Sequence, residues 1–468
     1  MSTLERIYTA SPVALQNLFL SAYGLVLYRR RFGRQHARLK REIEGWERLS
    51  PREMYRREGL RLRDTVTSAA ERVPYYREMF RRLRIDPRTI DSRDRLQALP
   101  LLDKHTVRQQ PARFHAEAVG GSLSVCTSGS TGSPLTVRCN RDALQGNYAH
   151  FYRLRERLGI AARDRCATFA GRTIVPAHTS APPYWRHNLV TNTLLFSTYH
   201  ITPASIDDYL ERLASFRPAL IDSYPSALGL IASRARELGI HIRPRAILTS
   251  SETLTEMQRH AAEEAFECQV TDQYGSAEMV AFIAQCTHGT YHAWPSYGIA
   301  EVLVDGRPAR PGEAGELVCT GFINPAMPLL RYRTGDMAVA GDGCPCGSPY
   351  PSIVGIEGRM DDILVTPDGR RVGRLDPVFK GAPDDAFHEA QIVQEALDRV
   401  TLRYVRGTGQ SQEAVAMVLQ ELRKRLGPHV RVDSEEVAGL ERGANGKLRA
   451  VITKVAHAPR PEERKAHG

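Results

Sequence analysis

The chain of 468 residues is 42% hydrophobic and 25% charged, a composition typical of a soluble globular protein with room for roughly two or three domains. Its formal net charge of +11 is carried mainly by arginine. No helix-turn-helix, zinc-finger or RRM signature accompanies that charge, so we expect no nucleic-acid partner. Eight cysteines without a cleavable signal segment indicate a reducing, cytoplasmic setting rather than a disulfide framework.

Up to about Ile90 the pattern is helical, because apolar residues recur every three or four positions among arginine and glutamate. The apolar stretch 15–28 is interrupted by Gln16, Asn17 and Ser21, and is too short and too polar to span a bilayer. An arginine run follows it, so this helix either packs on the main domain or lies on an anionic membrane face. We expect the packed arrangement, with the apolar side against the main domain, because docking within the chain avoids the cost of association with a membrane.

From Leu99 to Asp336, short runs rich in Val, Ile and Leu alternate with amphipathic stretches, which predicts α/β layers. Three runs separated by glycine turns are expected to form antiparallel strands, at 302–304, 315–319 and 337–340. After Gly358 the pattern becomes that of a compact α+β unit of roughly a hundred residues. There we expect a strand, a turn at 367–369, a strand, a helix at 384–397, a strand at 400–405 and a helix at 413–426.

The segment 128–132, Ser-Gly-Ser-Thr-Gly, follows a short apolar run and has the composition of a phosphate-binding loop. Glycines let a backbone approach an anion closely, and hydroxyl and N–H groups can hold phosphate oxygens. A flexible turn is the alternative interpretation. The Walker pattern is absent, because Gly132 is followed by Ser133-Pro134 rather than by Lys and Ser or Thr. The positive charge on the phosphates must therefore come from Mg²⁺ and from a lysine elsewhere in the chain.

Four more segments follow in order: Tyr-Gly-Ser-Ala-Glu at 274–278, Tyr-Arg-Thr-Gly-Asp at 332–336, Gly-Arg-Met-Asp-Asp at 358–362 and Asn-Gly-Lys at 445–447. With the phosphate loop, this order resembles the adenylate-forming superfamily and, within it, the phenylacetate–coenzyme A ligase family. The resemblance extends from about Val73 to Lys454. Three further segments resemble a branch associated with capsular or exopolysaccharide biosynthesis, at 11–24, 185–188 and 224–226.

The resemblance implies an α/β fold with two parts: a large multi-layer N-terminal domain and a small mobile α+β C-terminal domain. Residues 1–98 would be a mainly helical segment of the large domain, and 99–360 its ATP- and acyl-binding body. The small domain would span 361–456. Residues 457–468 contain two prolines and no apolar run, so we expect a disordered tail.

The resemblance also implies ATP with Mg²⁺ and assigns the nucleotide contacts. The phosphates would be held by Ser128, Gly129, Ser130, Thr131 and Gly132. Beside adenine and the α-phosphate would lie Ser251, Glu252, Tyr274 and Gly275. Glu278 would support Mg²⁺, and Asp336 would accept both ribose hydroxyls through its two carboxylate oxygens.

By the same resemblance, Lys447 would bridge the substrate carboxylate and the α-phosphate in the first half-reaction. Arg359 and Asp361 would form the hinge on which the small domain swings. Two departures concern later steps: Ser133 stands where many relatives carry lysine, and 366–370 replaces the usual glycine-basic stretch. The first half-reaction therefore has more support than the second.

Three cysteines and one histidine offer a ligand set suited to tetrahedral zinc: Cys286, His292, Cys344 and Cys346. Buried free cysteines are the alternative. Resemblance to zinc-bearing members of the family favours the metal. Because four protein ligands close the coordination shell, such a zinc would be structural.

An acyl pocket is expected in a segment rich in aromatic residues, lined by Arg172, Trp185, Tyr199, His200 and Tyr224. Core packing is the alternative for the aromatic side chains. Arg172, Arg186 and His200 are harder to bury without partners, which suggests a polar or anionic acid as substrate.

The expected function is that of an ATP-dependent acyl-adenylating ligase, with coenzyme A as the acyl acceptor. An amine or hydroxyl of a sugar or small molecule in polysaccharide biosynthesis is the alternative acceptor. A non-catalytic nucleotide-binding homologue is the alternative of a different class, and a kinase lacks its Walker lysine. The sequence leaves open which carboxylic acid is used and how many copies associate.

Overall fold

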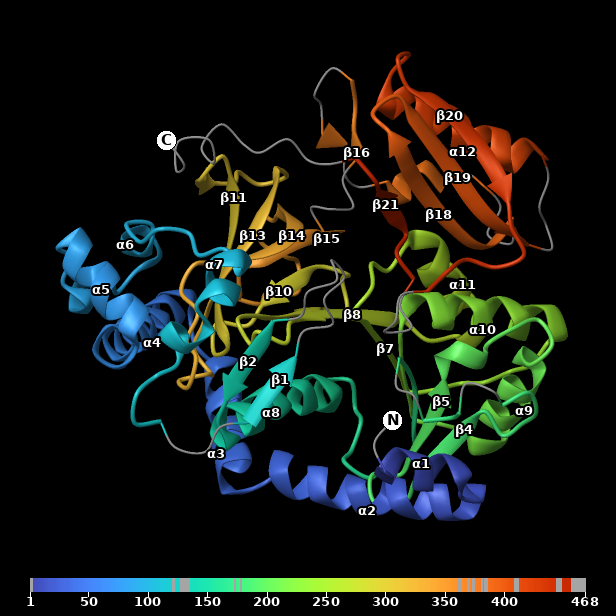
Figure 1. Ribbon diagram of the computed structural model, residues 1–468, viewed down its shortest axis with the longest axis horizontal. Helices are drawn as coiled ribbons and strands as arrows, with labels where there is room; N and C mark the ends of the chain where they lie inside the picture. The colour runs from blue at the N-terminus through green and yellow to red at the C-terminus, as the bar shows by residue number, and fades with distance from the viewer. Residues whose placement is uncertain are drawn as a thin grey trace.

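The computed structural model describes residues 3–119, 123–126, 135–171, 174–176, 179–359, 364–367, 371–372, 375–379, 382, 386–407, 412–442 and 448–455. A large part is built on a 13-stranded sheet and a small C-terminal part on a four-stranded sheet. The small part, in orange and red, lies over α10 and α11 of the large part (Figure 1). The predicted α/β class with a separate α+β unit is confirmed.

Helices open the chain, as the sequence predicts: α1 (Thr3–Ala10), α2 (Val13–Arg31), α3 (Arg34–Trp46), α4 (Pro51–Arg72), α5 (Pro74–Leu83), α6 (Arg93–Leu96) and α7 (Lys104–Gln109). Helix α4 begins at a capping box in which Ser50 accepts from the Glu53 N–H and the Glu53 carboxylate accepts from the Ser50 N–H. Proline at its first position suits the start of a helix, where an N–H would have no partner. Local sequence therefore fixes where this helix starts.

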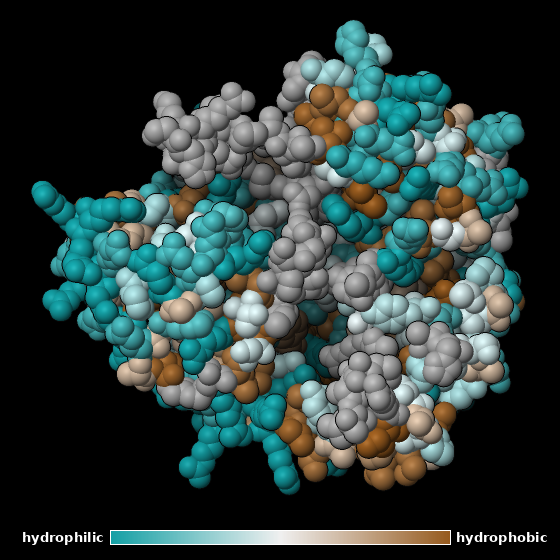
Figure 2. All heavy atoms as spheres, viewed as in Figure 1, coloured by the Kyte–Doolittle hydropathy of each residue, from teal (hydrophilic) through white to brown (hydrophobic). Residues whose placement is uncertain are grey.

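Helix α2 packs along the sheet edge, but not with the side we expected. Its buried residues are Gln16, Ser21 and Gly24. Most of its large apolar side chains are exposed, while Leu20 and Leu27 are half-buried. Figure 2 shows brown side chains gathered along the lower edge of the molecule, where Figure 1 draws α1 and α2. The prediction that the apolar side packs on the main domain is wrong, because the surface that receives α2 is a polar strand edge.

Among the described helices, none combines the length and hydropathy that a membrane crossing requires.

The large sheet contains β3 (Cys166–Ala170), β4 (Trp185–Asn188), β5 (Thr193–Ser197), β6 (Leu220–Ser223), β7 (Ala246–Ser250), β8 (Val270–Gly275), β9 (Phe282–Gln285), β10 (Tyr291–Ala293), β11 (Gly298–Val304), β12 (Arg307–Pro308), β13 (Ala314–Gly321), β14 (Tyr332–Ala340) and β15 (Ser352–Arg359). Their order is β12-β11-β13-β14-β15-β10-β9-β8-β7-β6-β3-β5-β4. Strands β5, β3, β6, β7 and β8 are parallel to one another. The three predicted antiparallel strands correspond to β11, β13 and β14 and are confirmed.

Several hydrophobic clusters of described residues stabilise this part, and two of them show how the helices are attached. Helices α9 (Ile206–Phe216), α10 (Pro225–Leu238) and α11 (Glu256–Phe266) connect the parallel strands, and their apolar residues pack with Phe169 and Phe196. Residues of α4 and α5, among them Leu62 and Tyr76, share a second cluster with the antiparallel strands. The N-terminal helices are therefore integral to the large part.

A two-stranded hairpin, β1 (Leu123–Cys126) and β2 (Thr136–Cys139), precedes α8 (Arg141–Arg157). The residues 127–134 that connect its strands carry the predicted phosphate loop and lie outside the described residues.

The small part contains β16 (Leu364–Val365), β17 (Arg371–Val372), β18 (Phe387–Ala396), β19 (Arg399–Arg406), α12 (Gln412–Leu426), β20 (Arg431–Glu436) and β21 (Val451–Thr453). The expected strand at 400–405 and helix at 413–426 are confirmed. The expected helix at 384–397 is wrong, because most of that segment is strand β18. Strand β18 pairs antiparallel with β19 and parallel with β21, and this pairing outweighs the helix preference of its Glu, Gln and Ala residues.

Candidate active site

The predicted site residues follow the carboxyl ends of neighbouring parallel strands. Tyr199 and His200 follow β5, Tyr224 follows β6 and Ser251 follows β7, while Gly275 ends β8. Because the strands are parallel and in register, these ends meet at one edge of the sheet. Ligands of open α/β sheets bind at this edge. The topology thus gathers residues that are far apart in the sequence.

Tyr274 and Asp336 contact each other directly, as a shared nucleotide site requires. The Tyr274 hydroxyl, on β8, donates to Asp336 Oδ2 on β14 at 2.6 Å. Burial, together with the nearby Asp336 carboxylate, raises the pKa of Tyr274 well above its usual value. The phenol therefore stays protonated and acts as a fixed donor to the carboxylate.

A bulge in β14 directs Asp336 toward β8. Glu316 pairs with Met337 and Val318 with Arg333, so Leu317 faces the three residues 334–336. Gly335 has φ +80°, a conformation that glycine adopts without strain. Thr334 Oγ1 donates to the Leu317 carbonyl at 2.8 Å. Bulges beside active sites commonly redirect a side chain in this way.

Glu278 lies beside this pair in a nearly closed environment. Its side chain is 9% exposed and lies 3.8 Å from Lys104 Nζ, and the Tyr332 hydroxyl donates to Glu278 Oε1 at 3.1 Å. A buried carboxylate with a single distant cation has coordination capacity left for a metal.

Lys104 is a charged residue of this site that the sequence analysis did not select. It begins α7, whose N-cap is Asp103. Leu102 joins β14 through a bridge to Tyr332, which brings Lys104 to Glu278. The available signal in the sequence was a lysine directly after a possible N-cap aspartate, Asp103.

Two buried side-chain atoms at the end of β8 lack a partner within the described part of the chain: Gln273 Oε1 and Ser276 Oγ. Buried polar atoms normally have a hydrogen-bond partner. Both lie in the segment predicted to border adenine and the α-phosphate. A polar ligand at this place would satisfy them.

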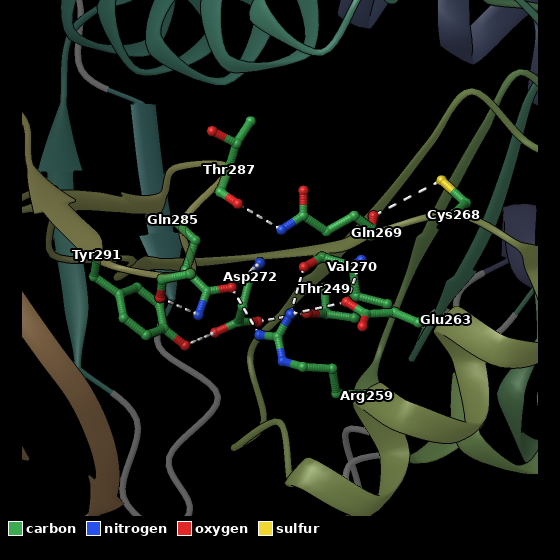
Figure 3. A network of polar contacts seen from close by, with 11 residues as sticks. Thr249, Arg259, Glu263, Cys268, Gln269, Val270, Asp272, Gln285, Thr287 and Tyr291 are labelled. Atoms are coloured by element: carbon green, nitrogen blue, oxygen red, sulfur yellow. Dashed lines mark hydrogen bonds and ion pairs between the residues drawn. The ribbon is translucent and has the colours of Figure 1, made fainter. Parts of the chain in front are cut away.

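A polar network holds β8 in position (Figure 3). Thr249 on β7 donates to Asp272 Oδ1 at 2.6 Å, and Tyr291 on β10 donates to Oδ2 at 2.7 Å. Arg259 of α11 donates to the Val270 carbonyl at 2.6 Å. Burial raises the pKa of Asp272 to about 6. The network ties three strands and one helix together two residues before Tyr274.

The Glu252 carboxylate joins the large and small parts. It accepts from the Ser226 N–H at 2.9 Å and from the Leu448 N–H at 2.7 Å. Arg442 of the small part donates to Ser226 Oγ at 2.7 Å and to Glu389 at 2.5 Å. Burial raises the pKa of both Glu252 and Glu389. Glu252 therefore holds Leu448, the residue directly after Lys447. The predicted place of Glu252 beside adenine did not include this contact.

The expected acyl-pocket residues have ordinary structural partners. Trp185 and Tyr224 pack against the cluster of the parallel strands. His200 contacts Ser197 Oγ at 2.7 Å and the Pro176 carbonyl at 3.2 Å, and Tyr199 donates to the Gly171 carbonyl at 3.3 Å.

Arg186 does not line this pocket. It is 3% exposed and donates to Gln16 Oε1 at 2.5 Å and to two backbone carbonyls. The Arg186 guanidinium therefore holds α2 in place. It no longer supports the expectation that the substrate is an anionic acid.

Several predicted site residues lie outside the described part of the chain: Ser128, Gly129, Ser130, Thr131, Gly132, Arg172, Asp361 and Lys447. Of Arg359 the structure describes only the backbone, which pairs with Asp336 in the sheet. Their assigned roles stay predictions.

The four predicted metal ligands lie together, with ligand atoms within 4.8 Å of one another. Cys286 Sγ is 3.6 Å from Cys344 Sγ, and Cys346 Sγ is 3.3 Å from His292 Nε2. Tetrahedral zinc with Zn–S bonds of ~2.3 Å separates two sulfurs by about 3.8 Å, so the spacing fits. Backbone N–H groups of His288 and Ser348 point at two of the sulfurs.

The acid–base properties of the thiols also fit a cation. Burial opposes ionisation of Cys344, but hydrogen bonds with Thr290, Cys346 and His292 lower its pKa to about 6. Burial and the neighbouring thiols raise the pKa of Cys346 to about 11. Without a cation, ionisation of one thiol disfavours ionisation of its neighbours, because thiolates repel one another. A bound metal cation would compensate the negative charge of the thiolates.

Comparison with known proteins agrees with the fold. Residues 364–454 match the family model described as the CapK C-terminal domain. Protein CapK of Staphylococcus aureus is 25% identical over 460 residues, which cover 97% of this chain and 100% of that protein. The phenylacetate-coenzyme A ligase of Thermus thermophilus is 25% identical over 336 residues, or 65% of this chain and 70% of the ligase.

Among solved structures, a 2-hydroxyisobutyryl-CoA ligase in the postadenylation state, in complex with 2-HIB-AMP, has the same fold. Its TM-score is 0.71 at 21% identity, with 90% of this chain and 92% of that chain covered. The chain therefore has the fold of this ligase. In sequence it is similar to protein CapK and to phenylacetate-coenzyme A ligases, and its small part matches the CapK C-terminal domain.

Proposed function

We propose that the protein is an ATP-dependent acyl-adenylating ligase. The observation that carries the proposal is the convergence of Tyr274, Glu278 and Asp336 at the carboxyl edge of the parallel strands. The unpartnered Gln273 Oε1 and Ser276 Oγ support a polar ligand in the same place. Similarity to phenylacetate-coenzyme A ligases supports the reaction class.

In the proposed reaction, a carboxylate oxygen of the acid attacks the α-phosphorus of ATP, and the bond to pyrophosphate breaks. Asp336 binds the ribose hydroxyls, held in orientation by the Tyr274 hydroxyl. Glu278 would hold Mg²⁺, and the ion would supply charge neutralisation at the phosphates. Lys447 and the loop 128–132 contact the phosphates, a role taken from the family resemblance. The acyl group then passes from AMP to the acceptor.

We propose coenzyme A as the acceptor, supported by the similarity to phenylacetate-coenzyme A ligases. An amine or hydroxyl in polysaccharide assembly is the second candidate, and it rests on the resemblance of segments 11–24, 185–188 and 224–226 to a branch associated with capsular or exopolysaccharide biosynthesis. A cytoplasmic location suits both acceptors.

ATP–pyrophosphate exchange with a panel of carboxylic acids tests the proposal. We expect exchange with at least one acid, and a loss of on the order of 100-fold or more in Lys447→Ala, because a contact made in the transition state is removed. Lys454→Ala is the matched control, since Lys454 is an exposed lysine of the same domain. Nucleotide binding without exchange for any acid would indicate a non-catalytic homologue, and normal exchange in Lys447→Ala would remove that lysine from the mechanism.

We also propose one structural zinc ion per chain at Cys286, His292, Cys344 and Cys346. The sulfur and nitrogen spacing and the competition between the thiols support it. The zinc would join the β9–β10 hairpin to the loop between β14 and β15. It would thereby help to hold β14, the strand that carries Asp336.

A further inference from the structure

Helix α2 presents its polar side to the protein and its apolar side outward. Gln16 and Ser21 are 3% and 6% exposed, whereas Leu18 and Tyr23 are each 58% exposed. At about 100° per residue, Gln16, Asn17 and Ser21 fall within one arc of about 140° of the helical wheel, and Leu18 and Tyr23 fall in the remaining arc. A surface helix normally has the reverse orientation.

The polar side is required by the strand that it covers. Strand β4 ends the large sheet. Asn17 Oδ1 accepts from the His187 N–H at 2.9 Å, and Ser21 Oγ accepts from the Leu189 N–H at 3.0 Å. A Cβ at Gly24 would lie 2.3 Å from Asn188 Nδ2, so glycine permits the close approach. Side chains of α2 therefore accept hydrogen bonds from backbone N–H groups at the sheet edge. These contacts decide which side of the helix faces outward.

That outward side is an apolar patch. It consists of Leu15, Leu18, Phe19, Tyr23, Leu25 and Val26 of α2, each 39% to 58% exposed. Ile7 of α1, 51% exposed, and Leu189 beside α2, 65% exposed, extend it. Contiguous apolar patches are uncommon on soluble monomers and mark interaction sites. The brown area under α1 and α2 is this patch (Figure 2).

The patch continues into positive charge. Arg29 and Arg30 are exposed and lie on the outward side of the last turn of α2. No acidic residue occurs between Glu5 and Glu42. Among the described carboxylates, none forms an ion pair with Arg29, Arg30 or Arg34.

We propose that α2 docks in the plane of an anionic phospholipid membrane, with the apolar patch in the headgroup–acyl boundary and Arg29 and Arg30 on lipid phosphates. In-plane helices of this kind combine an apolar side with basic residues. A second copy of the chain is a poorer occupant, because two such patches would bring no acidic group to either arginine. The inference does not depend on the proposed ligase activity.

Flotation of the full chain with vesicles tests the inference. Vesicles of phosphatidylcholine with about one quarter phosphatidylglycerol should capture the protein at low salt, and pure phosphatidylcholine vesicles should capture much less. Raising the salt concentration should weaken binding, since the phosphate contacts are screened. Absence of binding to anionic vesicles would overturn the proposal.

Matched variants separate this patch from general stickiness. The triple variant Leu18→Ser, Phe19→Ser, Tyr23→Ser should lose at least ~10-fold in vesicle affinity. The control changes Leu238, Leu397 and Met417 to Ser, which are 42% to 44% exposed elsewhere, and should bind as the parent does. Arg29→Gln with Arg30→Gln should weaken binding to anionic vesicles by about fivefold per arginine, whereas Arg52→Gln with Arg56→Gln should not. Equal binding by all variants would contradict the proposal.

Sedimentation velocity without lipid tests whether a second copy of the chain covers the patch. We expect the parent and the triple serine variant to sediment alike. Self-association of the parent that the triple variant abolishes, together with no vesicle binding, would assign the patch to a second copy of the chain instead.

Discussion

At the scale of single residues, the site depends on groups whose partners come from other elements. Tyr274 and Asp336 are 62 positions apart and joined at 2.6 Å. The tyrosine keeps its proton because it is buried beside a carboxylate. Asp336 is thus held in one orientation before any ligand arrives, which lowers the ordering cost of binding.

Asp336→Ala should weaken ATP binding by about 10- to 100-fold, because a hydrogen bond to a charged group is worth about 1.5–3 kcal/mol. Tyr274→Phe, which removes only the orienting hydroxyl, should have a smaller effect. Titration calorimetry measures both. Asp342→Ala, an exposed acid near the end of β14, is the control, and unchanged affinity in Asp336→Ala would exclude the ribose role.

Asp272 gives a prediction about pH. The pKa of its carboxyl is raised by burial from 3.8 to about 6, so the folded protein binds a proton there at a higher pH than the unfolded chain does. Stability from this group therefore increases as pH falls through 6. Relative to Asp272→Asn, the parent should gain about 1.4 kcal/mol in free energy of unfolding between pH 7.5 and 5.

Urea unfolding at several pH values checks this difference. The exposed Asp398→Asn should follow the parent at every pH. If the parent and Asp272→Asn instead differ by a constant amount, the carboxyl does not titrate in this range.

At the scale of elements, β8, β9 and β10 act as a unit because the Asp272 network joins them (Figure 3). The proposed zinc site lies at the turn end of the β9–β10 hairpin, where Cys286 follows β9. Gln285, next to Cys286, accepts from the Asp272 N–H at 2.9 Å. Order at the metal site and order at the end of β8 are therefore connected through hydrogen bonds.

Cys344→Ser should lower the zinc content of purified protein from about one equivalent per chain and reduce the melting temperature, because one ligand of a closed shell is lost. Elemental analysis and thermal unfolding measure the two effects. Cys268→Ser, a free thiol away from the cluster, should change neither. Zinc-free parent protein with unchanged stability would refute the proposed site.

At the scale of the whole molecule, few polar contacts connect the large and small parts at the residue after Lys447. Glu252 accepts from the Leu448 N–H, and Arg442 lies between Ser226 and Glu389. A hinged small domain needs contacts that can form and break during the cycle. Arg442, whose side chain is 17% exposed, is the cation beside both Glu389 and Glu252, so its removal leaves both acids without compensation.

Arg442→Ala should therefore reduce pyrophosphate exchange by about 10-fold or more and make the chain between the two parts easier to cleave by protease, because the cation of the contact is lost. The control is Arg431→Ala, an exposed arginine of the same part. Exchange and cleavage equal to the control would show that this contact does not hold the small part in its active position.

The sequence by itself predicted the class of fold, the resemblance to phenylacetate–coenzyme A ligases, the three antiparallel strands of the large part and the grouping of the four candidate metal ligands. These depend on local patterns: alternation of strands and helices, glycine turns, and residue types that bind a metal at short range. Family resemblance also selected Tyr274, Glu278 and Asp336, which the structure brings to one place. The roles of Lys447, Asp361 and the phosphate loop stay predictions.

Tertiary structure decided the features that depend on partners distant in the chain. Segment 384–397 has helix-forming residues, yet it becomes β18 because two other strands pair with it. Lys104 joins the site only because Leu102 adds to β14. Helix α2 turns its apolar side outward because the polar edge of β4 must be satisfied. Hydrophobic patterning predicts which side of a helix is apolar, but only the receiving surface decides which side is buried.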